Sequence, residues 1–240
     1  MKIKISTAVQ TGISHIQEGR PCQDYVATAD FESNRCVAIA DGAGGITHSE
    51  IGARLITKWA AQTFSQNFED WFVLSEEQLK ATLLDQSREY LSTQFSDVQA
   101  DCTLLIFAVK EDGRYLWVHI GDGVILGVYP HRNVVLSPPE NGDEPNQTFF
   151  LSGRDAISHM RCEKGRIKDL RSVMLCSDGI SDTLWNPKTD TFASAVTLLS
   201  EWQTAEDEKI IGQVLERELN ETFREHTKDD MSIALISFVV

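Results

Sequence analysis

Residues 36–45 read Cys-Val-Ala-Ile-Ala-Asp-Gly-Ala-Gly-Gly and carry the strongest structural signal in the chain. The apolar run 36–40 has the length of a buried strand, and it ends at Asp41 and a loop with three glycines. Glycine lets the backbone approach a ligand closely, and a carboxylate at the mouth of a buried strand is poorly screened by water. The stretch therefore predicts a strand that ends at a cation or phosphate site, although Asp-Gly is also an ordinary turn dipeptide.

Helices are predicted after this loop and near the C-terminus. Thr47 and Glu50 have the spacing of a capping box, and apolar residues recur at helical spacing as far as Phe64. A second capping box, formed by Ser75 and Gln78, opens the next helix. A further amphipathic pattern predicts a helix over about 204–223.

Strands are predicted on both sides of the first two helices. Apolar or alternating runs of strand length lie at 2–10, 25–29, 36–40, 103–110, 114–120, 124–129, 172–176 and 231–240. Residues 138–170 are rich in Gly, Pro and charge without a clear period, and we expect a long surface excursion, for which a mobile lid is one role left open. Because strands and helices do not alternate regularly, the order favours an α+β fold with antiparallel sheets flanked by helices. No repeat or linker interrupts the chain, so residues 1–240 are predicted to form a single domain.

The composition restricts the classes of function. A net charge of −14 over 240 residues, without a basic stretch, would repel a nucleic-acid backbone. No apolar run reaches the length of a membrane span, and the N-terminus lacks the apolar block of a secretion signal. The five cysteines form no Cys-x-x-Cys pair, which argues against a structural zinc site and a disulfide framework. We therefore expect a cytoplasmic protein that binds neither nucleic acid nor membrane.

Four predicted strands carry a carboxylate at one end, at Asp24, Asp41, Asp178 and Asp229. If these side chains converge at one rim of the sheets, they cannot all stay ionised unless cations intervene. Oxygen ligands select hard cations such as Mg²⁺ or Mn²⁺. Two such ions would activate a water molecule and clamp a phosphoryl oxygen, which predicts a hydrolase of phosphate esters.

In these residues the chain resembles the metal-dependent type 2C protein phosphatases, and among them the compact bacterial branch. The matching segments follow one another along nearly the whole chain, at 19–24, 41–45, 121–123, 177–182 and 229–232. The resemblance implies a four-layer α-β-β-α sandwich of two antiparallel sheets, with two Mg²⁺ or Mn²⁺ ions at one end. It also implies hydrolysis of phosphoserine and phosphothreonine in proteins by a metal-activated water, in opposition to a Ser/Thr kinase.

The same resemblance implies the ligands. The matching metal-binding positions are Asp24, Asp41, Gly42, Asp178, Asp182 and Asp229. Asp41 would bridge both ions, and with Asp178 and Asp229 it completes the candidate catalytic set. The carbonyl of Gly42 would bind one ion, and Asp24 would act directly or through water. Asp182 resembles the ligand of a weaker third ion, whose other carboxylate is left open between two nearby positions, Asp97 and Asp101.

Three departures from the family pattern bear on rate and substrate. Ala43 stands where many members have a histidine proposed as general acid, so a water would have to protonate the leaving group unless it leaves easily. Gln23 stands where the family frequently has Glu, and its neutral oxygen should weaken the binding of one metal ion. The phosphate-binding arginine of the animal enzymes falls at Gly19. Arg20, one position on, is the candidate substrate-binding residue because a guanidinium matches phosphate bidentately.

Other polar residues near the motifs receive structural roles. Asp122 is expected to shape a Gly-Asp-Gly turn, and Asp230 departs from the commonest family pattern. His15, His48 and His119 are expected to be satisfied partners in polar networks rather than metal ligands.

Two other functions remain open. A phosphatase-like scaffold that binds a phosphorylated or nucleotide ligand without catalysis is consistent with the missing His and Glu. A dinucleotide-binding fold would also place a strand before Gly42-Ala43-Gly44. However, Thr47 occupies the place of the third glycine, and Asp41 would set a negative charge against a pyrophosphate.

Overall fold

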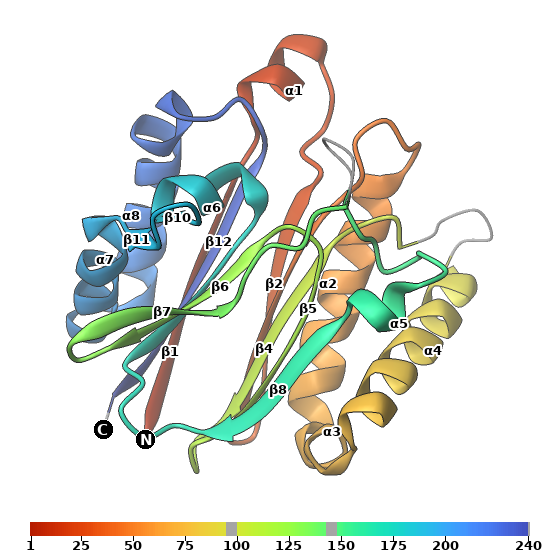
Figure 1. Cartoon of the computed structure of the whole chain (residues 1–240), viewed down its shortest axis with the longest axis horizontal. Coiled ribbons are helices and arrows are strands. Elements are labelled where there is room, and N and C mark those ends of the chain that lie inside the picture. Colours follow the sequence, from red (N-terminus) through yellow and green to blue (C-terminus); the bar gives the residue numbers. More distant parts are fainter. Residues whose placement is uncertain (95–99, 143–147, 240) are drawn as a thin grey trace.

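The strands of the computed structural model, which describes residues 1–94, 100–142 and 148–239, form two five-stranded sheets and a small hairpin (Figure 1). The first sheet has the order β1 (Lys2–Gln10), β12 (Met231–Val239), β9 (Ser172–Cys176), β6 (Val124–Tyr129) and β7 (Arg132–Ser137). The second has the order β2 (Asp24–Phe31), β3 (Asn34–Asp41), β4 (Leu104–Lys110), β5 (Arg114–Ile120) and β8 (Arg161–Arg166). The hairpin pairs β10 (Trp185–Asn186) with β11 (Thr191–Phe192).

Every strand pair in the described ranges is antiparallel. The predicted α+β class with antiparallel sheets is therefore confirmed. A dinucleotide-binding fold needs a parallel sheet with crossover helices, so that alternative is excluded.

Helices cover the outer faces of both sheets (Figure 1). The second sheet is covered by α2 (Ser49–Gln66), α3 (Phe68–Val73) and α4 (Glu76–Gln94), and the first by α7 (Ser194–Ala205) and α8 (Glu208–Glu221). The short helices are α1 (Ile13–Glu18), α5 (Ala156–His159), α6 (Asp178–Leu184) and the 3₁₀ turn η1 (Phe223–Glu225). The four-layer sandwich implied by the family resemblance is thus confirmed. None of the described helices combines the length and the apolar character needed to cross a bilayer.

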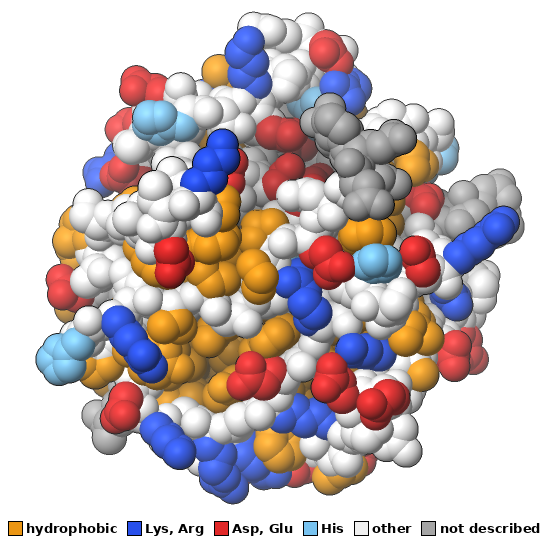
Figure 2. All heavy atoms as spheres, viewed as in Figure 1, with side chains coloured by type: hydrophobic (Ala, Val, Ile, Leu, Met, Phe, Trp, Pro, Cys, Tyr) orange, Lys and Arg blue, Asp and Glu red, His pale blue; other side chains and the backbone are white. Residues whose placement is uncertain are grey.

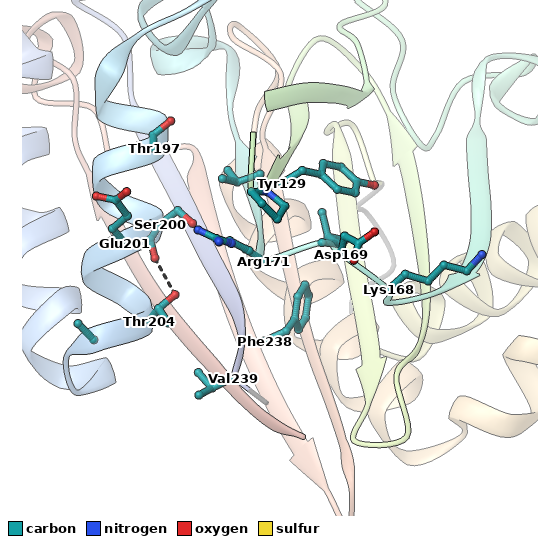
Figure 3. A pocket seen from close by; sticks show the side chains of 14 residues that line it. Tyr129, Lys168, Asp169, Arg171, Thr197, Ser200, Glu201, Thr204, Phe238 and Val239 are labelled. Atoms are coloured by element: carbon teal, nitrogen blue, oxygen red, sulfur yellow. Dashed lines mark hydrogen bonds between the residues drawn. The ribbon is translucent and has the colours of Figure 1, made fainter. Parts of the chain in front are cut away.

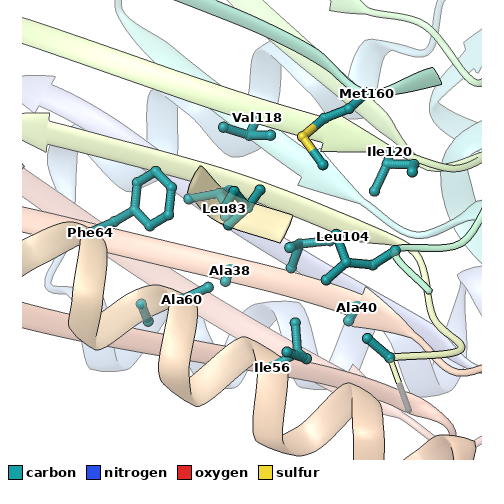
Figure 4. Packing of buried hydrophobic residues seen from close by; sticks show 14 of the residues in the cluster. Ala38, Ala40, Ile56, Ala60, Phe64, Leu83, Leu104, Val118, Ile120 and Met160 are labelled. Atoms are coloured by element: carbon teal, nitrogen blue, oxygen red, sulfur yellow. The ribbon is translucent and has the colours of Figure 1, made fainter. Parts of the chain in front are cut away.

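The core explains why residues 36–40 are apolar without interruption. Alternate side chains of a strand point to opposite faces of its sheet. Ala38 and Ala40 of β3 therefore pack against α2, beside Ile56 (Figure 4), whereas Val37 and Ile39 pack in the layer between the two sheets. Because both faces are covered, neither set of positions tolerates a charge. Asp41 marks the point at which the strand leaves this core.

Two helix starts test the capping predictions. The capping box at Ser75 is confirmed, because Ser75 N donates to Gln78 Oε1 at 2.9 Å and Gln78 N donates to Ser75 Oγ at 3.3 Å. The prediction of a capping box at Thr47 is wrong. There α2 begins at Ser49, and its N-cap is His48, which has a left-handed φ of 66° and makes no side-chain cap. The chain enters α2 through left-handed conformations at Gly45 and His48, which helix propensity alone does not predict.

The segment 138–170 and the helix predicted over 204–223 also differ from expectation. Within the first, β8 pairs with β5 as an edge strand, and Leu151, Ala156 and Met160 are buried in the core. The prediction of a surface excursion is therefore wrong for much of the segment. Residues 143–147 lie outside the described ranges. The edge strand escaped detection because an exposed edge needs no apolar alternation. The C-terminal helix begins later than predicted, at Glu208, where Asp207 accepts a hydrogen bond from Lys209 N.

Candidate active site

Five strand ends meet at one rim of the sandwich. In the second sheet, Asp24 opens β2 and lies directly opposite Asp41, which closes β3. In the first sheet, Cys176 closes β9 and pairs with Val124 of β6 on one side and with Ile233 of β12 on the other. The loops attached to these strand ends, 121–123, 177–178 and 229–230, therefore lie beside one another.

A cleft of about 1320 Å³ opens at this rim. Five carboxylates line it, from Asp41, Asp122, Asp178, Asp182 and Asp229. Figure 2 shows acidic side chains at the bottom of a hollow near the top of the molecule. Among the described residues that line the cleft, none is Lys, Arg or His. The predicted convergence of Asp41, Asp178 and Asp229 on one cavity is therefore observed.

Asp24 lies beneath this cleft and is almost fully buried, with 1% of its surface exposed. Side chains directly opposite each other on antiparallel strands have Cβ atoms about 5 Å apart, so Asp24 and Asp41 form a close pair of like charges. Burial, and then the charge of Asp230, raise the pKa of Asp24 to about 7, although the hydroxyls of Ser177 and Ser232 act in the opposite direction. Among the described residues, Asp24 Oδ2 has no hydrogen-bond partner.

The pKa values of three carboxylates in the cleft, Asp41, Asp122 and Asp178, are also raised. Burial raises the pKa of Asp41 well above its usual range, and the charges of Asp24, Asp178 and Asp122 raise it further. Burial is also the main cause of the raised pKa of Asp178, followed by the charges of Asp122 and Asp24. Burial, and then the charge of Asp229, also raise the pKa of Asp122. Its Oδ1 has no hydrogen-bond partner in the part of the chain that the structure describes.

The donor chemistry fits a divalent cation, but the present arrangement is not a finished ligand cage. In the described part of the chain, no group of three or more Asp, Glu, His or Cys side chains is arranged so that it could hold an ion. Nevertheless, Asp24 and Asp122 each have a buried oxygen without a described hydrogen-bond partner, and neighbouring carboxylates help to raise the pKa values of Asp41 and Asp178. Hard cations prefer such oxygen ligands. Side-chain movement towards a shared ion would complete the cage.

The glycine loop is anchored beside these carboxylates. Gly42 N donates to Gln23 O at 3.0 Å, and a Cβ at Gly42 would lie 2.9 Å from the backbone of Ser49, so only glycine fits there. Gln23 Nε2 donates to Ser49 Oγ at 2.7 Å and to Ala43 O at 3.2 Å. Gln23 therefore ties the loop to β2, while Ala43 lines the cleft.

The remaining predicted residues lie further out. Asp182 is an exposed residue of α6 on the cleft wall. The carboxylate of Asp101 accepts a hydrogen bond from Ser152 Oγ at 2.6 Å, and Asp97 lies outside the described ranges. Arg20 follows α1, is exposed, and pairs with Glu18 at 2.6 Å. Arg20 is not among the described residues that line the cleft, so its role in substrate binding stays a prediction.

Asp122 lines the cleft, whereas the sequence predicted only a role in shaping a turn. Its position between β5 and β6 brings its carboxylate into the cleft with the other acids, rather than leaving it only to shape a turn. The signal was present, because Asp122 also follows a strand that ends at this rim. The expectation for His15 is confirmed, since His15 Nδ1 lies 2.8 Å from Asp230 Oδ2 in a buried polar pair.

A second cavity, of about 580 Å³, lies at the other end of β12 (Figure 3). Arg171 extends there towards Ser200 and Glu201 of α7. The lining of this cavity contains charged residues of both signs, the basic Lys168 and Arg171 and the acidic Asp169 and Glu201. This cavity lacks the concentration of one charge that distinguishes the acidic cleft, so the cleft is the candidate active site.

Comparisons with known proteins agree with this choice. The family model described as "Protein phosphatase 2C" matches residues 11–224. Serine/threonine-protein phosphatase 3 of Escherichia coli K12 is 26% identical, over 98% of this chain and 98% of its own length. A serine/threonine phosphatase of S. agalactiae has the same fold, with a TM-score of 0.64, 14% identity and coverage of 99% and 100% of the two chains. RsbX in complex with magnesium also shares the fold, with a TM-score of 0.56, 14% identity and coverage of 99% and 96%.

Proposed function

This chain belongs to the protein phosphatase 2C family, and we infer that it is a phosphoprotein phosphatase that hydrolyses phosphoserine and phosphothreonine with the help of Mg²⁺ or Mn²⁺. One observation carries the metal dependence. Asp24 and Asp41 face each other on neighbouring strands, and the cleft above them holds further acids without a described base. Such a cluster holds protons in the ion-free protein, and divalent cations would displace those protons in the working state.

The acidic residues of the cleft would have different roles in binding the ions. Asp41, Asp178 and Asp229 would hold two ions, with the carbonyl of Gly42 as a further ligand and Asp24 acting from beneath, directly or through water. When bound, Mg²⁺ or Mn²⁺ supplies Lewis acidity that lowers the pKa of water and offsets phosphoryl charge. We assign Asp182 to a weaker third ion. Asp122 stands close enough to raise the pKa of Asp178, and we assign it to orienting that ligand.

The substrate enters a cleft whose walls are partly apolar. Ile46, Phe150, Trp185 and the prolines 138, 139 and 187 surround the acids, and this lining suits an extended peptide better than a small sugar phosphate. Arg20 would contact the phosphate or an acidic neighbour from the exposed turn after α1. Ala43 offers no proton to the departing hydroxyl, so we expect strong dependence on the leaving group.

We further propose that residues 1–240 act as one catalytic domain, since each sheet contributes to the layer between the sheets and to one outer core. The five cysteines are free thiols, which supports a reducing compartment, and we propose the cytoplasm. A phosphorylated protein made by a Ser/Thr kinase is the proposed partner. A non-catalytic binding module is not favoured, because the family model covers residues 11–224 and a serine/threonine-protein phosphatase is similar over 98% of the chain.

The decisive experiment is hydrolysis of phosphoserine and phosphothreonine peptides after treatment with a chelator and titration with Mn²⁺ or Mg²⁺. We expect phosphate release that depends on the added ion and disappears in Asp41→Asn. A phosphatase that keeps full activity in excess chelator would overturn the metal dependence. Binding of phosphopeptide without any release of phosphate would instead favour the binding module.

A further inference from the structure

The buried carboxylate of Asp230 takes no part in the mechanism above, although it directly follows the candidate ligand Asp229. It is 1% exposed and accepts three hydrogen bonds from one segment of the chain. Gly12 N donates to Oδ1 at 2.7 Å, while Gln23 N at 2.6 Å and His15 Nδ1 at 2.8 Å both reach Oδ2. Because a carboxylate accepts, His15 must carry its proton on Nδ1 in this contact.

These contacts join the two sheets at the end where the acids converge. Gln23 leads directly into Asp24 and β2 of the second sheet, whereas Asp230 leads into β12 of the first. Figure 1 shows α1, which contains His15, at the top of the molecule beside the loop that precedes β12. We call Gly12, His15, Gln23 and Asp230 the clasp.

The clasp also fixes the backbone of Asp229. A Cβ at Gly12 would lie 2.3 Å from the carbonyl carbon of Asp229, so the two backbones are in close contact. Ser14 N donates to Lys228 O at 3.1 Å on the other side of Asp229. Asp230 N in turn donates to Asp229 Oδ1 at 2.9 Å, which restricts the carboxylate itself. Gly12, Ser14 and Asp230 thus hold Asp229 from three directions.

We propose that Asp230 and His15 are positioning residues that set the distance between Asp24 and Asp229, and thereby the affinity for the catalytic ion. This inference rests on the proposed function. Asp24 and Asp229 come from different sheets, and no described backbone hydrogen bond links β2 to β12. Hydrogen bonds that orient metal ligands commonly change metal affinity by about 10–100-fold when they are lost.

The test compares two substitutions of one residue. In His15→Asn, the amide nitrogen stands where Nδ1 stood and keeps a donor to Asp230. In His15→Leu, the donor is lost while an apolar side chain fills the space. Asp230→Asn is the second route to the same loss, because its amide group presents hydrogens to backbone donors. Binding of Mn²⁺ is measured directly, from the electron paramagnetic resonance of the unbound ion, alongside phosphopeptide kinetics.

We expect His15→Leu and Asp230→Asn to raise the Kd for Mn²⁺ about tenfold, and His15→Asn to stay close to the unsubstituted protein. Phosphate release at saturating Mn²⁺ should recover most of its rate in His15→Leu. This split between metal affinity and saturated rate separates positioning from general damage.

Lys4→Met is the matched control for stability. Lys4 is also nearly buried and makes three hydrogen bonds, from Nζ to the carbonyls of Gln203, Thr204 and Glu206, but at the other end of the sandwich. The Lys4→Met substitution should lower Tm and leave the Kd for Mn²⁺ unchanged.

Three results would overturn the proposal: unchanged Mn²⁺ affinity in both His15→Leu and Asp230→Asn, a His15→Asn protein as weak as His15→Leu, or equal weakening in Lys4→Met. If the unsubstituted protein neither binds Mn²⁺ nor releases phosphate, the proposed function itself fails.

Discussion

Acidic side chains occur in two contrasting settings in this molecule. On the surface, Glu69 accepts hydrogen bonds from Arg114 and Lys110 at 2.6 Å, and Arg114 also reaches Asp112 at 2.8 Å. Arg114 first, and then Lys110, lower the pKa of Glu69 to about 2. In the cleft, by contrast, Asp41 and Asp178 lie near further carboxylates, and burial together with those charges raises their pKa values. The chain therefore has bases with which to neutralise acids but sets none among the described residues of the cleft, and this selective omission identifies the functional site.

The largest expected effect comes from removing one acid from each setting. Asp178→Asn should reduce phosphopeptide hydrolysis by more than about 100-fold, because a ligand is lost. The same change should raise the Tm of the ion-free protein, because it relieves repulsion and removes a buried charge. Glu69→Gln should leave hydrolysis unchanged and slightly lower Tm. Both variants are compared by phosphate release at saturating Mn²⁺ and by thermal unfolding in chelator.

The comparison fails if the two variants behave alike. Equal losses of activity would show that the cleft acids act only through the fold. A lowered Tm in ion-free Asp178→Asn would show that this carboxylate is satisfied in the resting protein, contrary to its raised pKa.

The acids at the strand ends could be predicted from the sequence, whereas one edge strand could not. Asp41, Asp178 and Asp229 were predictable because each adjoins an apolar strand, and strand ends gather at the rims of sheets. The layered α+β fold followed from the same runs. The edge strand Arg161–Arg166 was not predictable, because its side chains are partly exposed and have no apolar period.

Contacts across long sequence distances were also out of reach. His15 and Asp230 are 215 positions apart, and nothing in either local pattern indicates the other. Asp122 was undervalued because a Gly-Asp-Gly turn has a sufficient local explanation. The entry into α2 was wrong for the opposite reason, since a good local signal at Thr47 lost to the tight glycine loop. Local chemistry predicts which groups are available, whereas the register of the sheets decides which of them meet.

A smaller effect is expected from giving the cleft a protonatable base. Ala43→His replaces the methyl group of a residue that lines the cleft with an imidazole. We expect about a tenfold gain on phosphoserine peptides, below the 10²–10⁴-fold typical of an evolved general acid. p-Nitrophenyl phosphate should gain little, because its leaving group needs no proton. A gain of equal size on both substrates would assign the effect to binding rather than to proton transfer.

The charge of the cleft should also select substrates, by a factor of about three to ten between matched peptides. Five acids line the cleft, so two divalent ions would leave the cleft slightly negative. The whole chain also has a net charge of −14. Phosphopeptides with Arg on both sides of the phosphoserine should therefore show higher kcat/KM than those with Glu. The preference should shrink in 0.5 M salt, because screening weakens it. A preference for Glu would place an unrecognised base, with Arg20 as the first candidate, beside the phosphate.

The smallest expected effect, a change in Tm of a few degrees, separates the two settings by its sign. The pKa of Asp24 is raised from 3.8 to about 7, so between these values the ion-free folded protein binds more protons than the unfolded chain. Its stability must therefore fall as the pH rises through this window. The pKa of Glu69 is lowered from 4.5 to about 2, so its contribution is present above pH 4.5 and is lost on acidification.

Mn²⁺ removes the penalty at the cleft only where the carboxylates are ionised. It should raise Tm more at pH 7.5 than at pH 5.5, at about 2–4 °C for each kcal/mol gained by a chain of this size. Thermal unfolding with and without Mn²⁺ at both pH values measures the difference, and Glu69→Gln should not alter it. Equal stabilisation at the two pH values would mean that the ion binds away from Asp24, Asp41 and Asp178, because only binding to those raised carboxyl groups must displace protons.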